Sequence, residues 1–227
     1  MTKNPLIIAL DLESADAARS MVRSLGDSVR FYKVGLELYA AAGPDLLSEL
    51  VAEGCEVFLD LKLHDIGETV KRAAAQVARR GARFLTVHAV PQVMRAAMEG
   101  KAGSSLRILG VTVLTSLDQL DLAADGHSHS VEDLVALRVR NAVAVGLDGI
   151  VCSPLEVARV REITGPDTVL VTPGVRSAGA DAGDQKRVST PAQAVADGAN
   201  YLVIGRQVTR AADPRAEVLR ILEELAS

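Results

Sequence analysis

Eight short runs rich in Val, Ile and Leu recur along the chain, and the segments between them are long enough to hold helices. The runs cover residues 6–11, 30–34, 56–62, 83–88, 107–115, 148–153, 168–173 and 200–205. Strand followed by helix, repeated, predicts parallel strands joined by right-handed crossovers. Eight units in 227 residues average about 28 residues, which suits a (β/α)8 barrel. We therefore expect an α/β protein in which residues 1–227 form a single TIM-barrel domain. An open doubly wound sheet is the alternative, disfavoured because no GxGxxG motif follows the first run.

Helix signals fall between the runs. Residues 70–78 carry apolar side chains at the spacing of one helical face. Ser153-Pro154 with Glu156, and Thr190-Pro191 with Gln193, each place a capping residue, a first-turn proline and a capping-box partner in the expected order. These signals place helices where a barrel requires them.

Composition excludes several kinds of partner. The 25 basic and 29 acidic residues give a net charge of −4, which creates no field that would attract nucleic acid or an anionic membrane. Three Phe, three Tyr and no Trp predict an aliphatic core and leave no aromatic platform for stacked nucleobases. The longest stretch without a charged side chain, residues 84–94, is far shorter than the ~20 residues that span a bilayer. The apolar run 6–10 is too short for a signal peptide, so we expect a cytoplasmic protein.

Charged residues end the first four predicted strands. Side chains alternate along a strand, so Asp60 and Lys62 share a face with Phe58, while the apolar residues between them face the helices. The same rule predicts five inward-pointing side chains at the C-terminal rim, where barrel active sites lie: Asp11, Lys33, Asp60, Lys62 and His88. A solvated structural network is the alternative, but desolvating alternating charges is costly unless the array is used.

A second group of residues follows the last two predicted strands. Thr172-Pro173-Gly174-Val175-Arg176 ends the seventh strand, and Gly205-Arg206 ends the eighth. Barrels of this kind bind phosphate at these positions, where glycine allows close backbone approach and arginine can bind two phosphate oxygens. Residues 177–189, rich in Gly, Ala and Asp, predict a loop that covers a ligand. Cys55 and Cys152 stand alone, without the spacing of a metal site, and predict packed cysteines.

Taken together, these motifs resemble the orotidine 5'-phosphate decarboxylase family. The resemblance is carried over essentially the whole chain by DLKLHDI at 60–66, VLTS at 113–116, TPGVR at 172–176, Asp184-Gln185 and VIGR at 203–206. It implies that orotidine 5'-monophosphate is converted to UMP and carbon dioxide, the last step of pyrimidine nucleotide synthesis. It also implies that no metal or organic cofactor takes part.

The resemblance assigns roles by matching position. Lys62 would donate the proton to C6 beside Asp60, while Lys33 and Asp11 would hold the ribose hydroxyls and orient the array. Three residues would reach into the neighbouring subunit of a homodimer with shared active sites: Asp65, Ile66 and Thr69. The remaining substrate contacts would be to the pyrimidine or the phosphate: Thr115, Ser116, Gln185, Arg176, Gly205 and Arg206.

Two departures from the family pattern and three competing functions qualify this interpretation. Gly67-Glu68 stands where the family commonly has Pro-Asn, and Gln207 stands where proline is frequent. A metal-dependent sugar-phosphate decarboxylase or aldolase of the same superfamily is the nearest competitor, but such enzymes typically carry a carboxylate where this chain has Lys33. The second competing function is nucleotide sensing by a barrel without catalysis. The third is a barrel whose charged rim is purely structural.

Overall fold

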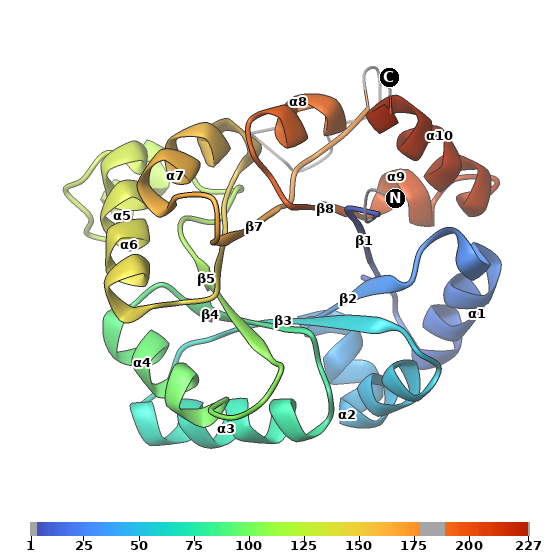
Figure 1. The fold of residues 1–227 in the computed structure, drawn as a ribbon, viewed down its shortest axis with the longest axis horizontal. Helices are drawn as coiled ribbons and strands as arrows, with labels where there is room; N and C mark the ends of the chain where they lie inside the picture. The colour runs from blue at the N-terminus through green and yellow to red at the C-terminus, as the bar shows by residue number, and fades with distance from the viewer. Residues whose placement is uncertain (1–3, 178–188, 227) are drawn as a thin grey trace.

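The computed structural model describes residues 4–177 and 189–226, in which eight parallel strands close into a barrel surrounded by helices (Figure 1). The strands are β1 (Leu6–Ala9), β2 (Phe31–Gly35), β3 (Glu56–Leu63), β4 (Phe84–His88), β5 (Arg107–Val111), β6 (Gly149–Val151), β7 (Val169–Thr172) and β8 (Tyr201–Ile204). Each strand pairs with the next, and β8 pairs with β1. The predicted (β/α)8 barrel is therefore confirmed.

Two strands are clearly shorter than predicted: β6 covers only Gly149–Val151 of the predicted 148–153, and β5 falls short by more. The apolar run extends to Thr115, but β5 ends at Val111. Val111 is the last residue of β5 paired with both neighbours, opposite His88 on β4 and Val151 on β6. Beyond this point the chain leaves the strand ladder, and residues 113–116 line the rim of the barrel instead.

The helices follow the strands as the sequence predicts. They are α1 (Ala15–Leu25), α2 (Leu36–Ala52), α3 (Gly67–Arg79), α4 (Pro91–Gly100), α5 (Gln119–Ala124), α6 (Val131–Val145), α7 (Val157–Thr164), α8 (Pro191–Ala196), α9 (Arg206–Thr209) and α10 (Pro214–Ala226), with 3₁₀ turns at Gly26–Ser28 and Pro154–Glu156. The Ser153 capping box forms, at the start of a 3₁₀ turn. The predicted Thr190 box is only half formed, because the Gln193 side chain donates to Asp197 instead.

The core has two layers of different composition. Aliphatic residues fill the space between the strands and the helices, as the composition predicts. Inside the barrel, however, four of the six aromatic side chains pack together: Phe31, Phe58, Phe84 and Tyr201. Together with six buried aliphatic residues, these rings fill the barrel below the charged rim. Cys55 and Cys152 are both buried, in agreement with the packed cysteines that the sequence predicts.

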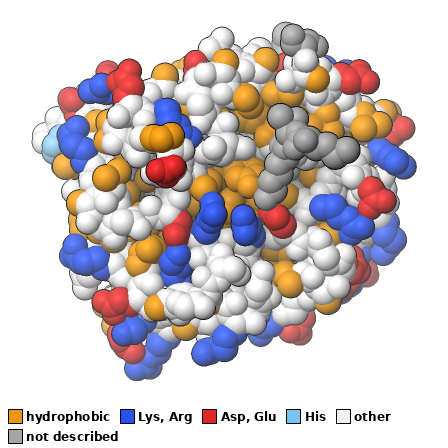
Figure 2. Space-filling model, viewed as in Figure 1, with side chains coloured by type: hydrophobic (Ala, Val, Ile, Leu, Met, Phe, Trp, Pro, Cys, Tyr) orange, Lys and Arg blue, Asp and Glu red, His pale blue; other side chains and the backbone are white. Residues whose placement is uncertain are grey.

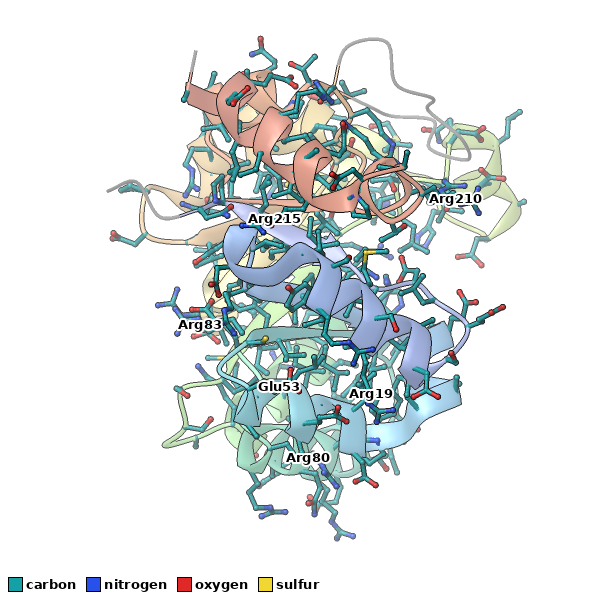
Figure 3. The ribbon with its side chains drawn as sticks, turned by 90° about the vertical axis from the view of Figure 1, so that its right-hand side faces the viewer. Arg19, Glu53, Arg80, Arg83, Arg210 and Arg215 are labelled. Atoms are coloured by element: carbon teal, nitrogen blue, oxygen red, sulfur yellow. The ribbon has the colours of Figure 1, made fainter. Side chains whose placement is uncertain are left out.

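The surface carries charges of both signs. Figure 2 shows acidic and basic side chains interspersed around one face of the molecule. Figure 3 places Arg83, which precedes β4, and Arg210, which follows α9, at opposite ends of the barrel. Within residues 4–177 and 189–226, no helix is long and apolar enough to cross a membrane.

Candidate active site

A cavity of about 790 Å³ opens at the C-terminal ends of the strands. Its walls come from β1, β2, β3, β5, β6, β7 and β8, either from residues of these strands or from the segments that follow them. Most of the residues singled out in the sequence line it: Asp11, Lys33, Asp60, Lys62, Thr115, Ser116, Arg176, Gly205 and Arg206. This end of the barrel is where barrel enzymes carry their active sites.

Lysines and carboxylates alternate along one wall of the cavity. Nζ of Lys33 donates to Oδ1 of Asp11 at 2.8 Å and lies 3.7 Å from Oδ2 of Asp60. The same oxygen of Asp60 accepts a hydrogen bond from Nζ of Lys62 at 2.9 Å. Four charges from three consecutive strands therefore form one continuous array.

The centre of the array is withdrawn from solvent. The side chains of Lys33 and Asp60 are 10% and 13% exposed, whereas Asp11 is 52% exposed. Burial alone would raise the pKa of Asp60, but the charges of Lys33 and Lys62 and the hydrogen bonds to its carboxylate hold that pKa below its usual value. Asp60 is therefore an anion at neutral pH, held in place between two ammonium groups.

Lys62 reaches this position through an unusual backbone. Its φ is 49°, in the left-handed region that residues with a side chain seldom adopt. The register between β3 and β4 shifts between Leu59 and Leu63, so Lys62 lies within a local irregularity of the strand. Thr86 on β4 stabilises it, because the Thr86 hydroxyl accepts from the Lys62 N–H and donates to Asp60 Oδ1, both at 2.9 Å. Strained backbone of this kind is concentrated at functional sites.

Gly35 also shapes the array. A Cβ atom at this position would lie 2.8 Å from Oδ1 of Asp11 and 2.9 Å from Nζ of Lys33. Both distances are too short for a carbon atom beside these polar atoms. The absence of a side chain at the end of β2 is therefore what leaves room for the Lys33–Asp11 pair.

The residues after β7 and β8 form the opposite wall. Arg176 and Arg206 both line it, next to Pro173 and Gly174. Gly174 has a φ of 76°, a conformation that favours glycine. Arg210, which the sequence reasoning missed, also lines the cavity one turn beyond Arg206. Its spacing of four residues from Arg206 is the signal that could have indicated a shared helical face.

Some predicted residues lie elsewhere. Asp65, Ile66 and Thr69 do not line this cavity; Ile66 is 70% exposed and its N–H donates to the Asp65 carboxylate. His88 was predicted to belong to the array, but its ring lies 5.3 Å from that of His64, and it does not line the cavity. Gln185, and most of the predicted loop 177–189, fall outside the described residues.

The sequence reasoning also missed the contribution of two kinds of residue. Thr86 carries no charge, and only its inward register position indicated that it could contact Asp60. Glu13 and Glu37 lie just beyond β1 and β2 and line the cavity, but acidic residues near strand ends are common on protein surfaces. Among the described residues, no group of three or more His, Cys, Asp or Glu side chains is placed to hold a metal ion.

The closed barrel, and the lysine–carboxylate array in its C-terminal cavity, define a (β/α)8-barrel enzyme. The chain belongs to the orotidine 5'-phosphate decarboxylase / HUMPS family, whose family model matches residues 4–221. The membership predicted from the motifs is therefore confirmed, and the name that the relatives share is that of a carboxy-lyase.

Relatives cover nearly the whole chain. It is 54% identical over 224 residues to orotidine 5'-phosphate decarboxylase from Rhodopseudomonas palustris strain BisB5, a match that covers 99% of this chain and 95% of the relative. The namesake protein of Methylobacterium nodulans is 52% identical over 228 residues, covering 99% and 97%. The crystal structure of orotidine 5'-phosphate decarboxylase from Lactobacillus acidophilus matches with a TM-score of 0.87 and 36% identity, covering 99% of this chain and 100% of that one.

Proposed function

We propose that this enzyme decarboxylates orotidine 5'-monophosphate to UMP and carbon dioxide, the last step of de novo pyrimidine nucleotide synthesis. The observation that carries the proposal is the array of Lys62, Asp60, Lys33 and Asp11 at the barrel mouth, whose centre is withdrawn from solvent. Family membership supports the same reaction. The proposal takes residues 1–227 as one cytoplasmic catalytic domain.

The array suits the chemistry of this reaction. Loss of carbon dioxide from C6 of the pyrimidine leaves a carbanion in the plane of the ring, where no neighbouring carbonyl can delocalise the charge. A fixed ammonium group at that position stabilises the developing negative charge, because its positive charge is already in place and needs no reorganisation during the reaction. Lys62 is the residue that we assign to this role, and its ammonium then donates the proton to C6. The hydrogen bond from Lys62 to Asp60 fixes the ammonium before the substrate arrives.

Asp60 acts by repelling the substrate, whereas Lys62 acts by attracting the developing charge. A substrate carboxylate about 4 Å from Asp60 would be repelled by about 4 kcal/mol at an effective dielectric constant near 20. That repulsion disappears as neutral carbon dioxide leaves, so it favours the transition state over the bound substrate. Binding the substrate against this repulsion requires favourable contacts elsewhere, and the phosphate group is the strongest candidate.

The remaining cavity residues bind the parts of the nucleotide that do not react. Asp11 and Lys33 face the ribose hydroxyls, and Thr115 and Ser116 lie against the pyrimidine. We assign Arg176, Gly205 and Arg206 to the phosphate, and Gln185, which lies outside the described residues, to both the base and the phosphate. The lining of the cavity supports this division, because the carboxylates lie on the walls from β1 to β3 and the arginines on the wall from β7 and β8. No metal or organic cofactor is part of the proposed reaction.

The phosphate contact has a direct test. Replacing Arg206 with Ala should lower kcat/KM for the nucleotide by roughly two orders of magnitude, because a charge-assisted hydrogen bond to phosphate contributes about 1.5–3 kcal/mol. Arg215→Ala is the matched control, since Arg215 is exposed and does not line the cavity. An unchanged kcat/KM in Arg206→Ala would remove Arg206 from the phosphate site.

Asp65, Ile66 and Thr69 require a second subunit. They lie outside the cavity of their own chain, and Ile66 exposes an apolar side chain at the start of α3. We assign them to the active site of the partner in a homodimer. Mixing inactive Lys62→Ala and Asp65→Ala variants should then restore part of the activity, because some mixed dimers contain one intact site. No recovery despite demonstrated subunit exchange would refute shared sites.

The reaction itself is tested by ultraviolet absorbance. Wild-type protein in EDTA should convert orotidine 5'-monophosphate to UMP, and Lys62→Ala should abolish the conversion. No conversion in EDTA, together with activity on a sugar phosphate after magnesium is restored, would instead assign the protein to the metal-dependent branch of the superfamily. Absence of both activities, with UMP binding retained, would indicate a nucleotide sensor.

A further inference from the structure

One glutamine joins the two arginine-bearing segments of the cavity wall, the segment after β7 and the segment after β8. Oε1 of Gln207 accepts a hydrogen bond from the N–H of Ser177 at 3.2 Å, and Nε2 of Gln207 donates to the Ser177 hydroxyl at 3.0 Å. Ser177 follows Arg176 and is 3% exposed, while Gln207 follows Arg206. The two residues that bind each other therefore sit directly beside the two arginines.

A third element fixes the orientation of the Gln207 amide. Its Nε2 also donates to Oε1 of Glu217 on α10 at 2.8 Å. Glu217 is in turn bound by Arg220 through two hydrogen bonds of 2.6 and 3.0 Å, and these hydrogen bonds lower the pKa of Glu217. An ionised carboxylate can only accept hydrogen bonds, so it selects the amide rotamer whose nitrogen points toward α10. The Gln207 oxygen is thereby left to accept from Ser177.

We propose that Gln207 is a positioning residue that sets the separation of Arg176 and Arg206 for the phosphate group of the substrate. The inference rests on the proposed function, because it needs a ligand whose phosphate meets both arginines. Two guanidinium groups grip one phosphate only when both are held at the correct distance from it. A displacement of about 1 Å in a binding contact of this kind is costly, because the geometry of the bound state is what the contact provides.

The test compares ligands with and without phosphate. Gln207→Ala removes all three side-chain hydrogen bonds and should weaken UMP binding by roughly tenfold or more, while the affinity for uridine stays the same. Isothermal titration of both ligands gives the ratio of the two affinities, which a general loss of stability would not change. In turnover, the loss should fall on KM more than on kcat. Gln193→Ala is the matched control, because Gln193 also donates to a carboxylate, Asp197, but lies on α8 away from the cavity.

A charge-swapped pair provides the rescue. Gln207→Glu alone places a second carboxylate beside Glu217 and should weaken UMP binding as Gln207→Ala does. Adding Glu217→Gln supplies a donor to the new carboxylate. This carboxylate still accepts from the Ser177 N–H, and the Ser177 hydroxyl, which accepts from Gln207 in the wild type, can rotate to donate to it. The double variant should therefore recover most of the UMP affinity, while Arg220 keeps its contact with Glu224 at 3.8 Å.

The outcomes separate the inference from the proposed function. Wild-type protein that neither binds UMP nor acts on orotidine 5'-monophosphate would overturn the proposed function, and the role of Gln207 with it. Wild-type activity with an unchanged UMP-to-uridine affinity ratio in Gln207→Ala would overturn the role of Gln207 alone. An equal loss of affinity for UMP and for uridine would assign Gln207 to the stability of the barrel and would also overturn the inference.

Discussion

Nζ of Lys62 and Oδ2 of Asp60 are hydrogen-bonded at 2.9 Å although the two residues are separated by one position on the same strand. Lys62 makes this contact from a backbone with a left-handed φ of 49°, which an ordinary extended strand does not have. Thr86 binds both partners, through the backbone N–H of Lys62 and the carboxylate of Asp60. One neutral side chain therefore supports the geometry of the central charge pair.

Replacing Thr86 with Val tests this support. Valine keeps the shape but removes the hydroxyl, leaving the buried side of Asp60 and the Lys62 N–H without that partner. We expect kcat to fall by one to two orders of magnitude, about 1.5–3 kcal/mol, with little change in KM. Thr86→Ser keeps the hydroxyl and should retain most of the activity. A Thr86→Val enzyme with wild-type kcat would show that the hydroxyl does not hold the pair.

Gly35→Ala tests the space beside the Lys33–Asp11 pair. The added Cβ would lie 2.8 and 2.9 Å from the polar atoms of Asp11 and Lys33, so the pair must separate or shift. We expect kcat/KM to fall at least tenfold, roughly 1.4 kcal/mol, measured by initial rates at low substrate concentration. Far-ultraviolet circular dichroism controls for the fold. Unchanged kinetics with a folded variant would mean that the pair can move without consequence.

His88 should make the stability of the enzyme depend on pH. Burial, followed by the charges of His64, Arg138 and Lys62, lowers the pKa of His88 below its usual value of about 6.5. The folded state therefore favours the neutral imidazole, and its contribution to stability is complete above about pH 6.5 and is lost as the pH falls through the lower folded pKa.

Urea unfolding at several pH values measures this effect. Between pH 7 and pH 5, the free energy of unfolding should decrease less in His88→Gln than in the wild type. The exposed His129 serves as the control, and His129→Gln should keep the wild-type slope. Identical slopes in His88→Gln and the wild type would contradict the prediction.

Asp148 should stabilise the end of the barrel opposite the cavity. Immediately before β6, its carboxylate accepts from Nζ of Lys101 and from the N–H of Ile108, both at 2.7 Å. Asp148→Ala should lower the free energy of unfolding by about 2–3 kcal/mol, since it leaves two partly buried donors unpaired. Asp148→Asn keeps an acceptor for Ile108 and should cost less. Equal urea midpoints for Asp148→Ala and the wild type would contradict this role.

Strand alternation predicted much of the fold and of the charged wall. The apolar runs marked every strand, because buried parallel strands need continuous Val, Ile and Leu. The inward position of Asp60 followed from the alternation of side chains along the third strand. The backbone of Lys62 could not be predicted, because a left-handed φ at lysine has no sequence signal comparable to that of glycine.

The sequence misplaced His88 for a different reason. Alternation assigns a side chain to a face of the strand but not to a neighbour on that face. His88 forms the last pair between β4 and β5, and its side chain lies against His64 from the segment after β3. The Gln207–Ser177 contact could not be predicted either. Its partners are 30 positions apart in the sequence, and strand alternation does not say which loops meet.

The pairing of β1 with β8 also has a consequence for how the enzyme is made. Asp11 lies near the beginning of the chain and Arg206 near its end, yet both line one cavity. A nascent chain that has not yet released β8 from the ribosome lacks the part of the cavity wall that carries Arg206. During refolding, helices can form early from local contacts, whereas the joining of the first and last strands requires closure of nearly the whole chain. Recovery of nucleotide binding should therefore lag behind recovery of helical signal, and the lag would time the closing of the barrel.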